Sequence, residues 1–355
     1  MRIALLSFYS GHLNRGAETW THEFANKLSG RGNELTVFQG GKYKKDADYR
    51  VVELLFPVNW VKGHVGNVLF LDYWSILVAQ FSLKTLPFLW REKFDIVIPV
   101  NGGWQTFLVR LITWLRGSKM VVVGHSGVGG RDEIWNAWNM PDAYVGLSSR
   151  AKEWAKRINP FIRVSYIPNG VDLQKFKPQG KKLKTGLKKP VILYVGALDL
   201  WKRPLETIRA VAQIKNASLL VVGDGGLREE AKNLGEKLLG QRFSLKTFSY
   251  NKMSAVYRVA DVFTSPSSSG YSFEIVLIEA MATNLPIVAN DDPVRREILG
   301  NAGIFVDPTN TKVYTKALNE VLRRDFGNRP RVQAEKFSWG KISRQYEDLF
   351  KKLIK

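Results

Sequence analysis

Short runs of apolar and β-branched residues recur along the chain, separated by stretches with helical periodicity. The first half of the chain contains such runs at residues 3–6, 35–38, 96–100, 120–123, 144–147 and 164–167. The second half contains them at residues 191–195, 218–222, 244–248, 261–264, 287–289 and 304–306. Continuous apolar runs that alternate with helices are typical of parallel sheets covered on both faces. The pattern therefore predicts an α/β protein with one set of strands in each half.

A lysine-rich segment separates the two sets of predicted strands. Residues 175–190 read KFKPQGKKLKTGLKKP and contain seven lysines and no acidic residue. Because this segment has no apolar face to bury, we expect a solvated linker or an exposed loop. The predicted N-terminal domain is residues 1–172, the linker 173–190 and the C-terminal domain 191–337. An amphipathic helix is predicted for residues 338–355.

Composition narrows the range of partners and locations. A chain of 355 residues is long enough for two domains, and the absence of cysteine excludes disulfides and cysteine-based metal sites. No secretory signal opens the sequence, so a cytoplasmic location is expected. The formal net charge of +21 predicts a polyanionic partner, either nucleic acid, an anionic membrane or an acidic substrate. No nucleic-acid reader motif is recognisable, so specific nucleic-acid binding is not expected.

An aromatic-rich stretch at residues 56–94 favours the membrane among these partners. Its part from 69 to 90 is nearly long enough to span a bilayer, but polar residues and a proline interrupt it. A helix lying in the interface of the inner leaflet is therefore predicted, with Trp60, Trp74 and Trp90 as candidate anchors. A buried helix of the N-terminal domain has the same periodicity and remains the alternative.

Residues 266–290, PSSSGYSFEIVLIEAMATNLPIVAN, predict a loop, a helix that contains Glu279, and a short strand. Glu279 lies in the apolar run IVLIEAMA, where a carboxylate is costly to bury without a partner. Either it pairs within the core, or it accepts hydrogen bonds from the hydroxyls of a ligand near a helix N-terminus, where phosphate also binds.

This segment resembles the Glu-x7-Glu region of the retaining GT-B glycosyltransferases of family 4. The resemblance implies that Glu279 binds the ribose of a nucleotide. The first glutamate of the motif would stand at position 271, which is tyrosine, and Glu274 lies only five residues before Glu279. This departure leaves the contact to the donor sugar open, and we retain Glu274 as a catalytic candidate. The resemblance also implies donor-binding roles for Tyr271, Ser272, Phe273, Ile275 and Val276.

Two further motifs of the family occur in the N-terminal half. Arg15-Gly16-Ala17-Glu18 resembles the Gly-Gly-Ala-Glu loop, in which a glycine lets backbone N–H groups approach the donor diphosphate. Gly16 and Ala17 are therefore candidate donor-binding residues. His125 follows the predicted strand at 120–123 and resembles the active-site histidine that contacts the donor sugar. The alternative for His125 is a histidine that caps a strand end.

The C-terminal half contains the remaining candidates. Gly196 ends a predicted strand and Lys202 follows six residues later, which is the family's spacing for the lysine that holds the donor phosphates. The arginine that usually follows the glycine is replaced by Ala197, and the adjacent Arg203 is a candidate to take its place. Two further residues complete the predicted donor-binding set: Gly223 and Tyr250.

Taken together, the motifs imply a GT-B fold of two Rossmann-like domains whose parallel sheets face a central cleft. They imply retaining transfer of a hexose from a nucleoside-diphosphate sugar to a glycan or lipid-linked acceptor. His125, Lys202 and Glu274 are the catalytic candidates. In the family the last helix crosses back to the N-terminal domain, which binds the acceptor.

No metal cofactor is expected, because cationic side chains and helix dipoles would stabilise the departing diphosphate. Asp46-Ala47-Asp48 matches the metal motif of another glycosyltransferase fold, but it lies in a charged stretch and is expected to be a solvated turn. Two alternatives to glycosyl transfer remain. One is another GT-B enzyme, a sugar-nucleotide epimerase or a phosphorylase. The other is a basic membrane-binding or nucleic-acid-binding protein with a decayed site, since Tyr271 and Ala197 depart from the family pattern.

Overall fold

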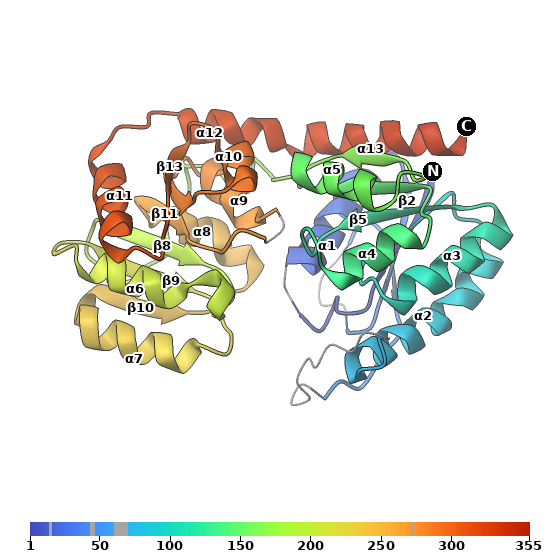
Figure 1. Cartoon of the computed structure of the whole chain (residues 1–355), viewed down its shortest axis with the longest axis horizontal. Coiled ribbons are helices and arrows are strands. Elements are labelled where there is room, and N and C mark those ends of the chain that lie inside the picture. Colours follow the sequence, from blue (N-terminus) through green and yellow to red (C-terminus); the bar gives the residue numbers. More distant parts are fainter. Residues whose placement is uncertain (14–15, 43–46, 60–69, 271–272) are drawn as a thin grey trace. The chain divides into compact units, whose positions relative to one another are not determined.

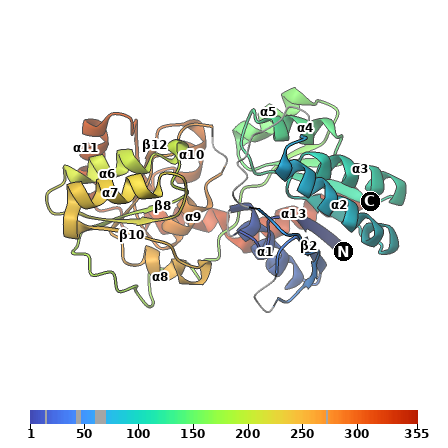
Figure 2. The same ribbon diagram turned by 90° about the horizontal axis from the view of Figure 1, so that it is seen from below.

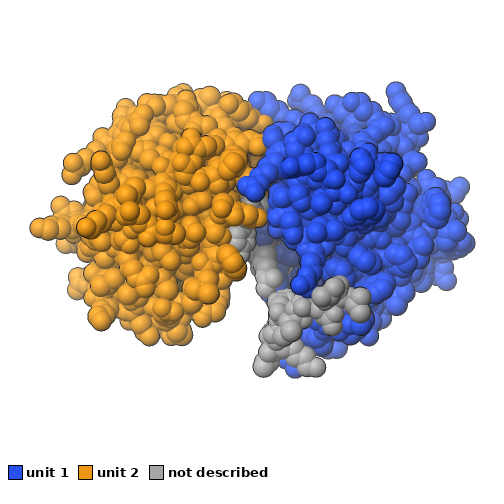
Figure 3. Space-filling view, viewed as in Figure 1, with its two compact units in different colours: residues 1–169, 340–355 blue, residues 170–339 orange. Residues whose placement is uncertain are grey.

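The computed structural model describes residues 1–13, 16–42, 47–59, 70–270 and 273–355 (Figure 1). The chain forms two compact units (Figure 3). The first comprises residues 1–169 and 340–355, and the second comprises residues 170–339. The change of unit falls at residue 169, three residues before the predicted boundary at 172.

The first unit is built on a seven-stranded parallel sheet of order β3-β2-β1-β4-β5-β6-β7. Its strands are β1 Arg2–Ser7, β2 Glu34–Gln39, β3 Arg50–Glu53, β4 Ile96–Pro99, β5 Lys119–Gly124, β6 Ala143–Gly146 and β7 Val164–Tyr166. The central strand β1 is buried because Ile3 pairs with Leu35 on one side and with Ile96 on the other. Buried strands of this kind are read from their continuous apolar runs.

Helices cover this sheet, and the C-terminal helix packs with them (Figure 2). They are α1 Gly16–Ser29, α2 Tyr73–Arg91, α3 Trp104–Arg116, α4 Arg131–Trp138, α5 Ser149–Ile158 and α13 Trp339–Ile354. The ring of Tyr346 in α13 lies edge-on to that of Phe24 in α1, with 4.8 Å between the ring centroids. Glu347 accepts hydrogen bonds from Arg31 at 2.7 Å and Asn33 at 3.0 Å. These contacts fix the end of the chain to the first unit.

The second unit is built on a six-stranded parallel sheet of order β10-β9-β8-β11-β12-β13. Its strands are β8 Val191–Val195, β9 Ser218–Val222, β10 Phe243–Lys246, β11 Val262–Ser265, β12 Ile287–Asn290 and β13 Gly303–Val306. The α-helices are α6 Pro204–Ala212, α7 Arg228–Leu239, α8 Met253–Tyr257, α9 Ile275–Ala282, α10 Pro293–Leu299, α11 Thr311–Arg323 and α12 Arg329–Ala334. Short 3-10 turns are η1 Leu200–Lys202, η2 Gly240–Arg242, η3 Tyr250–Lys252 and η4 Glu335–Phe337.

The lysine-rich segment is largely exposed, as predicted, but one arginine holds it against the second unit. Arg258 donates hydrogen bonds to the carbonyls of Lys175 at 3.0 Å and Lys177 at 2.8 Å. The backbone N–H of Leu183 also donates to the carbonyl of Ala255 at 3.1 Å. The segment is therefore a surface loop with fixed backbone contacts rather than a free linker.

The aromatic-rich stretch forms α2, which continues through Pro87. Asp72 caps this helix by accepting hydrogen bonds from the backbone of Trp74 and Ser75, both at 3.1 Å. Among the helices of the described residues, none is long and apolar enough to cross a membrane. Trp74 is buried in the core of the first unit, so its prediction as a membrane anchor was wrong. Trp90 is half-exposed, and Trp60 lies outside the described residues.

Candidate functional site

A buried carboxylate, Glu274, lies at the N-cap of α9. It accepts hydrogen bonds from two serine hydroxyls at the end of β11, Ser265 at 2.7 Å and Ser267 at 2.6 Å. It also forms ion pairs with Lys202 and, at 3.1 Å, with Arg295. The turn η1, the end of β11 with the loop after it, and helix α10 therefore bring two cations and two hydroxyls to one carboxylate.

The charge state of Glu274 follows from this environment. Burial by itself would raise the pKa of the carboxyl group, because it disfavours the charged form. Lys202 and Arg295, together with the hydrogen bond from Ser267, outweigh burial and hold the pKa of Glu274 well below its usual range. Glu274 is therefore ionised at neutral pH.

Arg295 was not among the site residues predicted from the sequence. Its side chain is completely buried. It lies on α10, and its Nη1 is 3.3 Å from the carboxylate of Asp292. Asp292 caps the same helix by accepting from the backbone of Val294 and Arg295. Within the described residues the three guanidinium nitrogens make no well-aligned hydrogen bond, so the two nearby carboxylates hold the charge through ion pairing. The spacing Asp292-x-x-Arg295 at a helix start is the only sequence signal for it.

Lys202 and Arg203 follow β8 through the turn η1. Asp199 caps this turn by accepting a hydrogen bond from the backbone of Lys202 at 2.9 Å. Arg203 has a left-handed backbone, with φ of 51°, and its Nη1 lies 3.2 Å from both the Pro266 carbonyl and the Asn290 amide oxygen. Both side chains thus converge on the loop that follows β11.

The glycine at the end of β9, Gly223, is required by the close approach of two backbones. The N–H of Gly196 donates to the Val222 carbonyl at 3.0 Å, and that of Leu198 donates to Asp224 at 2.9 Å. A Cβ atom at Gly223 would lie 1.8 Å from the carbonyl oxygen of Gly196. Gly223 therefore lets the two loops pack together beside Lys202, whatever contact it makes to a ligand.

Glu279, in the second turn of α9, is also buried and has a partner in the core. It accepts a hydrogen bond from the Tyr257 hydroxyl at 2.8 Å. Burial and the charge of Glu279 raise the pKa of Tyr257 well above its ordinary value, so the hydroxyl stays a donor. The core partner that the sequence left open is thus present, and it fixes the orientation of the Glu279 carboxylate.

The other predicted site residues of the second unit differ in how far their side chains are exposed to solvent. Phe273 is buried, with its ring centroid 5.6 Å from that of Phe337. Ile275 and Val276 are partly exposed in the first turn of α9, where backbone N–H groups have no acceptor within the helix. The Nζ of Lys175 lies 3.5 Å above the ring of Tyr250. Tyr271 and Ser272 lie outside the described residues.

The first unit contains His125, directly after β5. Its ring is edge-on to that of Trp20 in α1, with centroids 4.6 Å apart. The Nε2 atom is buried and has no hydrogen-bond partner in the described part of the chain. Burial lowers the pKa of His125 to about 4, so the imidazole is neutral at pH 7. Because Trp20 belongs to α1, the ring contact connects His125 to the helix that begins at Gly16.

The start of α1 leaves room above its backbone. Gly16 is exposed, and a Cβ atom added there would meet nothing within 4 Å. The carbonyl of Ala17 accepts a hydrogen bond from the Thr21 hydroxyl at 2.8 Å. Arg15, the preceding residue of the predicted loop, lies outside the described residues, as does Asp46 of the Asp-x-Asp match.

Glu133 is a second residue that sequence reasoning missed. It is buried on α4 and accepts hydrogen bonds from the Ser126 backbone at 2.8 Å and the Tyr144 hydroxyl at 2.7 Å. Burial raises the pKa of Glu133 to about 7, although these hydrogen bonds lower it in part. Glu133 therefore anchors the backbone next to His125, and its charge changes near neutral pH.

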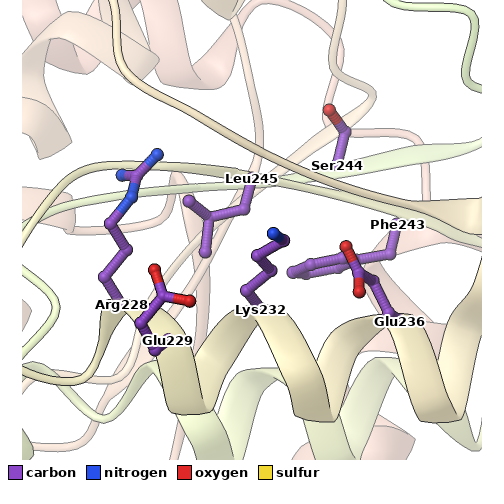
Figure 4. Close-up of a pocket in the computed structure, with 7 residues that line it drawn as sticks. All are labelled: Arg228, Glu229, Lys232, Glu236, Phe243, Ser244 and Leu245. Atoms are coloured by element: carbon purple, nitrogen blue, oxygen red, sulfur yellow. The ribbon is translucent and has the colours of Figure 1, made fainter.

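Across the described ranges, no group of three or more His, Asp or Glu side chains is arranged to hold a metal ion. A hollow between α7 and β10 is lined by charged and apolar side chains (Figure 4). None of the predicted site residues lines it, but Arg228 at its rim donates a hydrogen bond to the Gly223 carbonyl at 2.9 Å.

Comparison with known families gives matches to both halves of the chain. The model described as Glycosyltransferase Family 4 matches residues 14–175, and the one described as Glycosyl transferases group 1 matches residues 175–337. The chain belongs to the family 4 glycosyltransferases.

Curated relatives of this glycosyltransferase include phosphatidyl-myo-inositol mannosyltransferases. That of Mycolicibacterium smegmatis is 30% identical over 57% of this chain and 55% of its own length. That of Mycobacterium tuberculosis is 27% identical over 57% of each chain. The match thus spans little more than half of these relatives. An uncharacterized glycosyltransferase of Methanocaldococcus jannaschii is 26% identical over 99% of this chain and 98% of its own.

Solved structures of similar fold are GT-B glycosyltransferases. Sucrose-phosphate synthase from Thermosynechococcus elongatus aligns with a TM-score of 0.79, at 19% identity over 99% of this chain and 98% of that one. Anabaena HepE in complex with UDP aligns with a TM-score of 0.70, at 15% identity over 99% of this chain and all of that one. The two parallel sheets therefore form the GT-B fold, as predicted. The roles assigned to individual site residues stay predictions.

Proposed function

We propose that this glycosyltransferase moves a hexose from a nucleoside-diphosphate sugar to an acceptor hydroxyl with retention at the anomeric carbon. The observation that carries the proposal is the meeting of Lys202, Arg203 and the first turn of α9 at the loop that follows β11, with Glu274 paired to Lys202. Two cationic side chains beside a helix N-terminus are suited to a diphosphate.

The proposed chemical step breaks one glycosidic bond and forms another. The bond between the anomeric carbon and the diphosphate oxygen breaks, and its electron pair leaves with the diphosphate. The acceptor oxygen forms the new bond on the same face, and its proton passes to the departing phosphate. The demanding part is the negative charge on the leaving group, which a preorganised cationic site stabilises. We assign this role to Lys202, with Arg203 beside it.

The remaining residues position the donor in this proposal. Glu279, oriented by Tyr257, accepts hydrogen bonds from the ribose hydroxyls. From the family resemblance, we propose that the neutral imidazole of His125 contacts the hexose. Glu274 orients Lys202 through their ion pair. Because lysine and arginine supply the positive charge, we propose that transfer requires no divalent metal.

We further propose a glycan or lipid-linked acceptor and a peripheral location on the inner face of the cytoplasmic membrane. Support comes from the net charge of +21 and from the names of the mannosyltransferase relatives, which specify phosphatidyl-myo-inositol. A basic protein is concentrated at an anionic surface, where a lipid-linked acceptor would also be found.

A ligand screen followed by product analysis tests the proposal. A ligand that binds only the folded state raises the melting temperature, so UDP-glucose, GDP-mannose and ADP-glucose are compared by thermal shift. The stabilising donor is then incubated with acceptors that carry sugar or inositol hydroxyls, a polyprenyl-linked saccharide and phosphatidylinositol, in the presence of EDTA. A glycosylated acceptor with retained anomeric configuration is expected. Free nucleotide with an isomerised sugar and no acceptor product would instead indicate an epimerase. No stabilisation by any donor would contradict the proposal.

A further inference from the structure

Helix α2 exposes a stripe of large apolar residues on the surface of the first unit. Ile76, Leu83 and Trp90 are spaced seven residues apart, so they lie on one side of the helix. The opposite side, which includes Trp74 and Phe81, is buried in the core. An amphipathic helix normally turns polar residues to solvent, so this second apolar stripe is unusual.

Helix α3 exposes a similar stripe next to it. Its members follow helical spacing: Phe107, Leu111, Trp114 and Leu115. Trp114 is 76% exposed and Leu115 is 73% exposed. The two helices pack side by side (Figures 1 and 2), and the guanidinium of Arg116 lies 5.2 Å above the Trp90 ring. The two stripes therefore form one surface, which we call the α2–α3 face.

The charges on this face have one sign. Neither helix contains an acidic residue, and together they carry Lys84, Arg91, Arg110 and Arg116. Arg110 is paired with Asp142 at 2.8 Å, and Glu92, which follows α2, is paired with Arg50 at 2.8 Å. Lys84 and Arg91 are exposed. The face thus combines apolar side chains with cations.

We propose that the α2–α3 face docks this enzyme on an anionic lipid bilayer. Tryptophan and leucine side chains partition into the interface at the level of the headgroups, and cations beside them attract anionic lipids. A second copy of the chain fits less well, because a symmetric contact would place the cations of one face against those of the other. The face differs from the anchors expected from sequence, since Trp114 and Leu115 replace the buried Trp74.

This inference rests on the proposed function in one respect, the membrane location of the acceptor. The test of docking itself requires no transfer activity. The full-length protein is sedimented with vesicles of phosphatidylcholine alone and with vesicles containing half phosphatidylglycerol. Binding to the anionic vesicles at low salt, weakened at high salt, is expected. The double variant Trp114→Gln/Leu115→Gln is expected to lower the partition coefficient by about tenfold or more, since it removes two side chains from the interface.

Matched variants separate the face from the rest of the surface. Val313→Gln/Val332→Gln removes two exposed apolar side chains from the second unit and is expected to leave binding unchanged. Lys84→Gln/Arg91→Gln and Lys181→Gln/Lys182→Gln remove the same charge, and the first is expected to weaken binding more than the second. Circular dichroism melts confirm that each variant folds.

Several results would overturn the proposal. Wild-type protein that stays in the supernatant with both lipids excludes docking. Equal loss of binding in the Trp114/Leu115 and Val313/Val332 variants places the contact elsewhere. A lipid-free dimer that Trp114→Gln/Leu115→Gln abolishes would assign the face to a second copy. The donor-induced thermal shift is measured on the same variants. A normal shift without vesicle binding rejects docking alone, whereas vesicle binding without any shift rejects the proposed function alone.

Discussion

The buried guanidinium of Arg295 lies 3.1 Å from the carboxylate of Glu274, which also pairs with Lys202. Glu274 therefore has two cationic partners, one completely buried and one at the edge of the proposed donor site. If Lys202 binds the donor diphosphate as proposed, Arg295 still compensates the buried charge of Glu274. Lys202 could then turn to a ligand without leaving an unpaired carboxylate in the protein interior.

Replacing Arg295 by methionine tests this relationship. The variant leaves Lys202 as the cationic partner of Glu274 and removes the guanidinium beside Asp292, so the free energy of unfolding is expected to fall by about 3–5 kcal/mol. Donor affinity is expected to fall as well, because Lys202 must then stay with Glu274. Urea unfolding and donor titration measure the two effects. The neighbouring Arg296→Met is the control, since its guanidinium pairs with Asp291 at the surface. Equal stability of both variants would show that the buried pair is not required.

Lys202→Ala is expected to lower turnover far more than it lowers stability, since the ammonium is proposed to act on the departing diphosphate. Arg203 lies beside it, with Nη1 3.2 Å from the Pro266 carbonyl, and is able to share this role. Single-turnover rates are compared for Lys202→Ala, Arg203→Ala and the double variant. A silent single change with an inactive double variant means that the two residues share the role. Full activity in the double variant would refute the assignment of the phosphate site.

Glu279→Ala is expected to weaken donor binding by about 1.5–3 kcal/mol, which is typical of a hydrogen bond to a charged group. Tyr257→Phe is the companion variant, because it removes only the hydroxyl that orients the carboxylate. A smaller loss of affinity is expected for it. Isothermal titration with the donor identified by thermal shift measures both. An unchanged dissociation constant in folded Glu279→Ala protein would remove this residue from the site.

Glu133 predicts a dependence of stability on pH. Its pKa is raised to about 7 in the folded protein, above the ordinary value of 4.5, so the folded state binds more protons than the unfolded state between these values. The contribution of Glu133 to stability is therefore complete below about pH 4.5 and is lost as the pH rises through 7, by an amount on the order of 3 kcal/mol.

Urea unfolding between pH 5 and 8 measures this loss. Glu133→Gln is expected to flatten the decline, since an amide keeps the acceptor for the Ser126 backbone and does not titrate. Glu153→Gln, on the exposed side of α5, is the control and is expected to keep the wild-type slope. The same slope in wild type and Glu133→Gln would mean that another group causes the decline.

The strands could be predicted from the sequence because a buried parallel strand is a continuous apolar run, and every run predicted from the sequence is a strand in the structure. β3 was missed, because Arg50–Glu53 is a four-residue edge strand with charged ends and two partly exposed valines. Glu274 was identified by its place beside the motif. Its partner Arg295 was not, since 20 residues that include a strand lie between them in the chain.

The faces of α2 could not be predicted in the same way. Trp74 and Trp90 both fit an apolar helix, and the periodicity alone does not say which one meets the core. The neighbours decide it: Trp74 packs in the core cluster that includes Phe8 and Phe81, whereas Trp90 lies beside Arg116 of α3. The exposure of Trp114 likewise depends on what covers α3, which is a property of the assembled fold.

Arg258 has a consequence for the survival of the whole chain. Seven lysines within residues 175–190 would make a free segment an ideal substrate for trypsin-like proteases, which need an extended stretch of backbone. Arg258 binds the carbonyls of Lys175, Lys177 and Lys181 and so holds part of this backbone against the second unit. We therefore expect a single guanidinium to slow cleavage within the most basic part of the sequence.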